Sequence, residues 1–242
     1  MRVKSDRPTR NGGWLHRTAA APQPPRPPCR VYLPTPQPER NWPALLERWA
    51  RHTSPAQHGW LAHILGVSAA SLRRLGAALS DRPGVWAFPM FDAARQVIGI
   101  RLRAEDGHKW AVAGSHNGLF WPDGLAGSGP LLVCEGPTDT AALLDLGYDA
   151  IGRPSCTGAV EMVIEVVRRL HRRNVVVVAD ADTPGIDGAD RLAKALTEAG
   201  CRPKVIRPLS GKDARAWVRG GATRAVVDCT IANALYWRAP GG

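Results

Sequence analysis

The pattern of apolar and polar positions changes along the chain. From about residue 41, apolar residues recur at helical spacing through NWPALLERWARHT and QHGWLAHILGVSAASLRRLGAAL, and Ser68 stands at a favourable N-cap position. The runs WAFPMF, QVIGIRLR and HKWAVAG then follow, separated by the polar turns DAAR and AEDG. We therefore expect two or three short helices and, after them, an antiparallel meander.

After the break GLAGSGP, short apolar runs alternate with amphipathic ones. PLLVCEG, DAIGRPSC, NVVVVADAD and CRPKVIRPL have the pattern of strands, and the segments between them have the pattern of helices. A continuous run such as VVVV favours a parallel strand that is buried on both faces. The chain should therefore have an α/β fold, in which a small parallel sheet flanked by helices follows a smaller α+β half.

These patterns divide the chain into four segments. Residues 1–40 contain the closely spaced prolines of TAAAPQPPRPPC and LPTPQPER, which favour a disordered, Pro-rich linker or tail. Residues 41–127 should form the domain of helices and antiparallel strands. Residues 128–222 should form the α/β domain, and residues 223–242 a C-terminal helix and tail.

Positive charge indicates a polyanionic partner. Lys and Arg outnumber Asp and Glu by 32 to 21, a formal net charge of +11, which favours nucleic acid, although a GC-rich genome yields the same bias. Arg101, Arg103 and Lys109 alternate with apolar neighbours along two expected strands, so they should form a nucleic-acid-binding face or else a solvated one. AHILGVSAASLRRLG also has the pattern of a helix-turn-helix with Arg73 and Arg74 facing outward, or of plain helix packing.

Other features restrict the class of protein. Five cysteines are scattered without a C-x-x-C pair, so the sequence predicts neither a zinc site nor a disulfide framework. No apolar run approaches the roughly 18 residues that cross a bilayer, and MRVKSDRPTRNGG lacks the apolar core of a signal peptide. We expect a cytoplasmic protein that has no membrane partner.

Carboxylates follow two of the expected strands, where open α/β sheets place their ligand sites. LLVCEG ends with Glu135 and is followed by Asp139, whereas VVVVADAD ends with Asp180 and Asp182 and is followed by Asp187. Residues two apart on a strand share a face, so the aspartates of ADAD converge if the strand continues that far. Helix capping explains single carboxylates but not this pair, and hard oxygen ligands select Mg²⁺ or Mn²⁺. The spacing therefore predicts a divalent-metal site.

The order of LLVCEGPTD, VVVVADADTPGIDGAD and SGKDARAWV resembles the TOPRIM domain of bacterial and phage primases, topoisomerases and some nucleases. The resemblance covers about the last hundred residues. WAFPMFDAARQVIGIRLR and GHKWAVAGSHNGLF upstream are similar to the basic half of primases and primase-helicases. GGWLHR resembles a sequence that follows a zinc ribbon in such proteins, whose cysteines would lie before Met1. Truncation and loss of this module both stay open.

The resemblance implies a Mg²⁺-dependent primase-type nucleotidyltransferase that makes short RNA primers on a single-stranded DNA template from ribonucleoside triphosphates. It implies that Glu135 acts as general base or holds the metal, and that Asp180 and Asp182 bind it. Asp139 and Asp187 become further candidates for the metal or its waters. Lys212 and Asp213 match the later pair, and Lys212 is a candidate contact to phosphate. The host element would be a phage or another mobile element.

Two other functions stay open at this point. A TOPRIM nuclease would use the same carboxylates to cut a phosphodiester, and a DNA-binding replication accessory protein would keep the fold without turnover. A topoisomerase is disfavoured because Tyr32, Tyr148 and Tyr236 lie in no obvious cleavage module. SGKD lacks the spacing of a phosphate-binding P-loop, so a helicase partner would be a separate chain.

Overall fold

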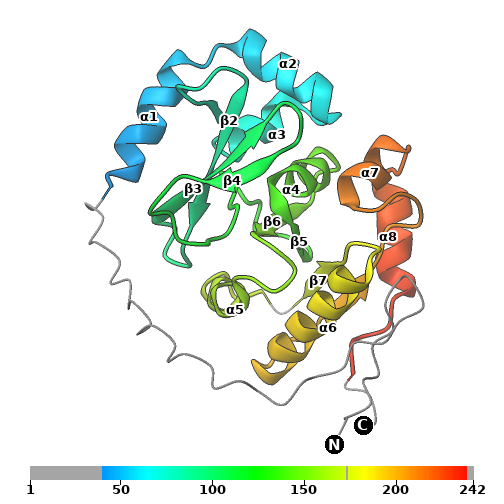
Figure 1. The fold of residues 1–242 in the computed structure, drawn as a ribbon. Helices are drawn as coiled ribbons and strands as arrows, with labels where there is room; N and C mark the ends of the chain where they lie inside the picture. The colour runs from blue at the N-terminus through cyan, green and yellow to red at the C-terminus, as the bar shows by residue number, and fades with distance from the viewer. Residues whose placement is uncertain (1–39, 173, 239–242) are drawn as a thin grey trace, which may run out of the picture. The chain divides into compact units, whose positions relative to one another are not determined.

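The computed structural model describes residues 40–172 and 174–238 (Figure 1). The expected linker of residues 1–40 therefore falls, apart from Arg40, outside the described residues. The described residues belong to one compact unit. None of the helices in these ranges is long and apolar enough to cross a membrane.

The first half confirms the expected helices and antiparallel meander. Its four strands have the order β1-β2-β3-β4, and each neighbouring pair is antiparallel. Asn41, Ser54 and Ser68 each accept an N–H bond from the residue three positions on, which explains where the helices begin. The elements are α1 (Trp42–His52), α2 (Pro55–Leu65), α3 (Ala69–Arg74), β1 (Ala78–Leu79), β2 (Val85–Phe91), β3 (Val97–Ala104) and β4 (Lys109–Ala111).

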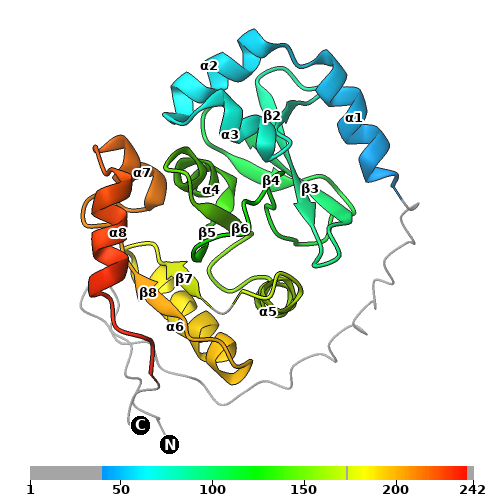
Figure 2. The ribbon, with the colours of Figure 1, turned by 180° about the vertical axis from the view of Figure 1, so that it is seen from behind.

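The second half is the expected α/β arrangement, with a four-stranded sheet in the order β6-β5-β7-β8 in which all pairs are parallel. Both figures show this sheet between helices (Figures 1 and 2). The elements are β5 (Leu131–Glu135), α4 (Gly136–Asp145), β6 (Asp149–Arg153), α5 (Val160–Arg169), β7 (Val175–Val178), α6 (Thr183–Glu198), β8 (Lys204–Ile206), α7 (Ala214–Arg219) and α8 (Arg224–Asn233).

The four consecutive valines of β7 are all buried because helices cover both faces of the sheet. Val176 and Val178 belong to a core cluster that includes residues of α4, α7 and α8. Val175 and Val177 belong to a second cluster with residues of α5 and α6. Figure 2 shows these two groups of helices on either side of the sheet. The absence of polar alternation in VVVV thus has the predicted cause.

The hydrophobic core continues from one half into the other. The cluster that contains Leu132 and Trp217 of the second half also contains Leu72 and Trp86 of the first. Burial of these large side chains favours a fixed arrangement of the antiparallel and parallel sheets. This matters for function because residues of both halves then contribute to one place.

Arg74 at the end of α3 contacts the segment that connects the two halves. Its guanidinium donates to the backbone oxygen atoms of Asp123, at 2.9 Å, and Gly124, at 2.7 Å. The expectation that Arg73 and Arg74 both face outward, as in a recognition helix, is therefore wrong for Arg74. Arg73 is exposed.

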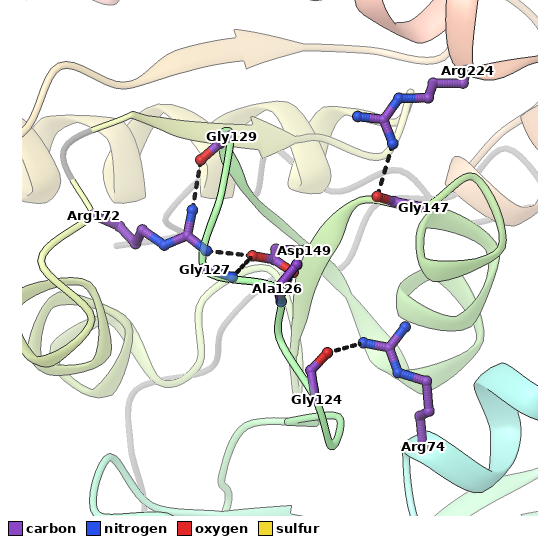
Figure 3. A network of polar contacts seen from close by, with 9 residues as sticks. All are labelled: Arg74, Gly124, Ala126, Gly127, Gly129, Gly147, Asp149, Arg172 and Arg224. Atoms are coloured by element: carbon purple, nitrogen blue, oxygen red, sulfur yellow. Dashed lines mark hydrogen bonds and ion pairs between the residues drawn. The ribbon is translucent and has the colours of Figure 1, made fainter.

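The connecting segment is also bound by a buried ion pair at the beginning of β6 (Figure 3). Asp149 accepts N–H bonds from Ala126, at 2.7 Å, and from Gly127, at 3.0 Å, and it pairs with Arg172. The same arginine donates to the backbone oxygen of Gly129 at 2.6 Å. The glycine-rich connection between the halves is thus held in place over most of its length.

Candidate metal and nucleic-acid site

The first two predicted ligands lie at the same edge of the parallel sheet. Strands β5 and β7 are neighbours, with Val133 opposite Val177. Glu135 ends β5, and Asp180 comes two residues after the end of β7. Parallel strands place their carboxyl ends together, so the topology brings these two carboxylates to one edge.

Asp182 reaches this edge by a different route from the one predicted. Strand β7 ends at Val178, so the two-residue spacing of a strand does not continue to Asp182. Asp182 is instead the N-cap of α6, where its side chain accepts the N–H of Gly185 at 2.9 Å. The predicted common strand face of Asp180 and Asp182 is therefore corrected to a strand end followed by a helix cap.

The later Lys-Asp pair lies beside these aspartates. The backbone N–H of Ala181 donates to the carbonyl oxygen of Lys212 at 2.8 Å. Lys212 Nζ lies 3.1 Å from an oxygen of Asp182. Asp213 is the N-cap of α7 and accepts the N–H of Ala216 at 2.7 Å. Two segments that are thirty residues apart in sequence are therefore joined at the sheet edge.

Asp139 is the most deeply buried carboxylate of the group. It lies in the first turn of α4, is only 7% exposed and accepts the backbone N–H of Arg215 at 2.8 Å. Burial, followed by the negative charge of Asp213, raises the pKa of Asp139 to about 7. An isolated helix cap does not require such an environment, so the structure associates Asp139 with the other site carboxylates.

Mutual repulsion is also evident at Asp180 and Glu135. Burial, and after it the charges of Glu135, Asp213 and Asp182, raise the pKa of Asp180 to about 6. Burial raises the pKa of Glu135 too, although the nearby guanidinium of Arg153 opposes the shift. The carboxylates are therefore close enough to disfavour one another's ionised forms.

Asp187 stays a prediction as a further ligand. It is exposed on α6, and its charge is not among the causes of the pKa shifts at Asp139, Asp180 or Glu135. Its proposed role as a further ligand gains no support from its position.

The donor set fits a hard divalent cation. The ligands are carboxylate oxygens, which Mg²⁺ and Mn²⁺ prefer, and a cation would remove the repulsion that raises the pKa values. Within residues 40–172 and 174–238, no three His, Cys, Asp or Glu side chains are already gathered as a metal-binding group. The chemistry of the site therefore fits the metal, while the side chains are not closed around a single point.

The predicted basic residues are near enough to Asp139 for its charge to act on two of them. Arg103 and Lys109 are directly opposite each other on β3 and β4. Partial burial lowers the pKa of each, and the charges of Asp139 and Arg215 also act on both. Cations on neighbouring strands repel each other unless an anion lies near them. The carboxylate of Asp139 thus offsets part of the repulsion between the cations of β3 and β4.

Arg101 lies two residues before Arg103 on β3, opposite Ala111. Its guanidinium lies 3.3 Å from the side-chain oxygen of Asn117, and partial burial lowers its pKa. Because residues two apart on a strand share a face, Arg101 extends the basic face along the strand.

Two arginines near the carboxylates were missed by the sequence reasoning. Arg153 ends β6 directly opposite Glu135, and Arg215 follows the Lys-Asp pair. A signal for Arg153 was present, because it closes the expected strand DAIGR next to the strand that ends in Glu135. The order of the strands, which sequence pattern alone does not provide, was needed to use it.

Comparison with known proteins agrees with the fold. Residues 132–217 match the family described as Toprim-like. No curated protein matches the sequence. Parallel strands with carboxylates at their carboxyl ends, together with this match, define the second half as a TOPRIM domain.

Solved structures extend the similarity beyond this domain. A DnaG primase catalytic domain bound to single-stranded DNA is 16% identical, with a TM-score of 0.62 over 80% of this chain and 77% of that one. The E. coli primase catalytic core is 18% identical, with a TM-score of 0.60 over 80% of this chain and 79% of that one. The primase fragment of the bacteriophage T7 primase-helicase is 18% identical, with a TM-score of 0.52 over 69% and 71%. Residues 132–217 are thus similar to the Toprim-like family, and the chain shares the fold of primase catalytic cores.

Proposed function

We propose that the chain is a primase-type nucleotidyltransferase, which synthesises short RNA primers on single-stranded DNA from ribonucleoside triphosphates. The observation that carries the proposal is the meeting of two opposite surfaces. Arg103 and Lys109 of the antiparallel sheet interact electrostatically with Asp139 of the TOPRIM domain. Template and triphosphate are polyanions that need the basic surface, and the metal of phosphoryl transfer needs the carboxylates.

Each group has a definite role in this proposal. Asp180 and Asp182 would hold Mg²⁺ or Mn²⁺, with Glu135 beside them as a general base or further ligand. When bound, the ion neutralises charge that develops on the transferring phosphoryl group. The guanidinium and ammonium groups of β3 and β4 would bind phosphates and orient them toward the carboxylates.

The two halves would act together because the connection between them is held in place. Arg74 and the Asp149–Arg172 pair bind the connecting segment at both of its ends. A reacting phosphate is aligned best when the basic face that binds it and the carboxylates that bind the metal do not move independently. We therefore propose that nucleic-acid binding and metal binding belong to one site rather than to two.

The proposed function also implies nucleic-acid and protein partners. One similar structure is described as bound to single-stranded DNA, and another is described as part of a primase-helicase. We propose single-stranded DNA as the template and a replicative helicase on a separate chain as a possible further partner, in a cytoplasmic replication setting.

The deciding experiment is primer synthesis on single-stranded DNA with labelled ribonucleotides and Mg²⁺, in which wild type is compared with Asp180→Ala. We expect short products from wild type and a loss of about 100-fold or more in the variant, because one charged ligand is removed. Nicking of the template without synthesis would indicate the nuclease instead. Binding without any reaction would indicate the accessory protein.

A second experiment tests the basic face. Lys109→Met should weaken single-stranded DNA binding severalfold and reduce the slope of log affinity against log salt by about one. Lys194→Met is a matched control, because Lys194 is an exposed lysine on α6 whose nearest acidic partner is Glu198, at 4.0 Å. Equal effects of the two variants would remove the special role of β4.

A further inference from the structure

A buried arginine lies next to Glu135, and the proposed reaction assigns no role to it. Arg153 is the last residue of β6, is directly opposite Glu135 in the parallel pairing and is only 2% exposed. One of its terminal nitrogen atoms, Nη1, is buried without a hydrogen-bond partner among the described residues. An arginine buried in this way is costly, so its retention at the sheet edge needs a reason.

The charges around Arg153 single out Glu135 as its main partner. Burial lowers the pKa of Arg153, and the carboxylate of Glu135 is the largest influence that opposes this shift. Arg191 of α6 acts on Arg153 in the unfavourable direction. The backbone N–H of Cys156, which follows β6, also stabilises the ionised Glu135. The end of β6 and the residues after it therefore favour the ionised form of Glu135.

The other carboxylates are neutralised differently. Asp182 has an exposed lysine, Lys212, at 3.1 Å, and a side chain of that kind can move away when a ligand arrives. Asp180 forms no ion pair with a described residue, and three neighbouring carboxylates raise its pKa. Among the described site carboxylates, Glu135 is the one that lies opposite an arginine only 2% exposed, Arg153.

We propose that Arg153 is a positioning residue for Glu135, which neutralises and orients this carboxylate and thereby leaves Asp180 and Asp182 as the principal holders of the divalent cation. This inference rests on the proposed function, because it assumes that the acidic edge binds a metal. The carboxylates then have different roles. Glu135 acts on the reacting nucleotide, whereas Asp180 and Asp182 provide the negative charge that binds the metal.

The inference predicts that metal binding and turnover change in opposite directions when the charge of Arg153 is removed. In Arg153→Met, the negative charge of Glu135 is no longer compensated and adds to the attraction for the cation. We expect Mn²⁺ to bind about three- to tenfold more tightly, which is the effect of one charge several ångströms away at an intermediate dielectric. Primer synthesis should fall about tenfold or more, because Glu135 loses its orientation.

The measurement is the dissociation constant of Mn²⁺ for the full chain at pH 8, obtained from the electron paramagnetic resonance signal of free Mn²⁺. Arg153→Lys, which keeps the charge, should restore the wild-type affinity and part of the activity. The control is the double variant Asp149→Asn/Arg172→Met, which removes the buried ion pair at the other end of β6 as a unit and should leave Mn²⁺ affinity unchanged. If Arg153→Met does not fold cooperatively, Arg153→Gln removes the same charge while keeping hydrogen-bonding groups.

The outcomes separate this inference from the proposed function. Tighter Mn²⁺ binding together with slower synthesis supports the role of Arg153. Unchanged or weaker Mn²⁺ binding in the charge-removing variants, with normal binding by wild type, overturns that role and leaves the proposed function standing. Absence of Mn²⁺ binding by wild type overturns both.

Discussion

Buried carboxylates have different surroundings at the two edges of the parallel sheet. At the amino edge, Asp149 has both oxygens bonded, to two backbone N–H groups and to Arg172. At the carboxyl edge, Asp139 and Asp180 lie among other carboxylates, which raise their pKa values. We infer that a buried acidic residue is structural where the protein supplies hydrogen-bond donors and a cation for it. It points to a ligand where the protein supplies more repulsion instead.

Breaking the amino edge should give the largest effect on stability. Asp149→Ala leaves Arg172 buried without its partner and frees the connecting segment at Ala126 and Gly127. We expect the free energy of unfolding to fall by about 3 kcal/mol or more, and the melting temperature by roughly 10 °C. Urea unfolding followed by circular dichroism measures this change.

The control for this variant is Asp123→Ala, which removes an exposed partner of Arg95. Exposed ion pairs contribute at most about 1 kcal/mol, so the control should unfold almost like wild type. A loss of stability no larger than that of the control would contradict a structural role for the buried pair.

The corresponding change at the carboxyl edge should have the opposite sign. Asp180→Asn removes a negative charge that three carboxylates disfavour, so the metal-free protein should become more stable by about 1 kcal/mol. Thermal unfolding in the presence of a chelator measures the effect. Saturating Mg²⁺ should stabilise wild type by about 2 to 3 kcal/mol at a hundredfold excess over Kd, and the variant by less. A destabilised Asp180→Asn would show that this residue is structural after all.

The free energy of unfolding should also depend on pH because of the carboxylates at the carboxyl edge. Asp139 and Asp180 have pKa values of about 7 and about 6 in the folded chain, whereas an aspartate in an unfolded chain titrates near 4. Between about pH 4 and pH 7 the folded state therefore binds more protons than the unfolded state, so the free energy of unfolding falls as pH rises.

We expect the metal-free protein to be more stable at pH 5 than at pH 8 by about 1 to 2 kcal/mol. Mg²⁺ should remove most of the difference, because it replaces the protons as the compensating charge. Melting temperatures across this range, with and without chelator, measure both effects. A metal-free protein that gains stability between pH 5 and pH 8 would contradict the repulsion at the carboxyl edge.

The sequence predicted most of the fold but only part of the site. The run VVVV identified β7 because a strand buried on both faces cannot alternate, and Glu135 was placed correctly at the end of a strand. Asp182 was misplaced by continuing strand geometry beyond Val178, because hydrophobic pattern does not reveal where a strand ends and a helix cap begins. Arg153 was missed because its meaning depends on which strands are neighbours, and this is set by tertiary packing.

The smallest effect is expected at Asp187, which the sequence placed among the further metal ligands. Asp187 is exposed on α6 and is not among the main causes of the pKa shifts at Asp139 and Asp180. Asp187→Asn removes the same charge as Asp180→Asn, seven residues away in sequence, and matches it in side-chain chemistry. We expect its Mn²⁺ affinity and primer synthesis to stay within about twofold of wild type, because an exposed charge is screened by solvent and salt. A tenfold loss of metal affinity in Asp187→Asn would contradict this expectation. Asp187 would then belong with the residues that bind the metal or its waters.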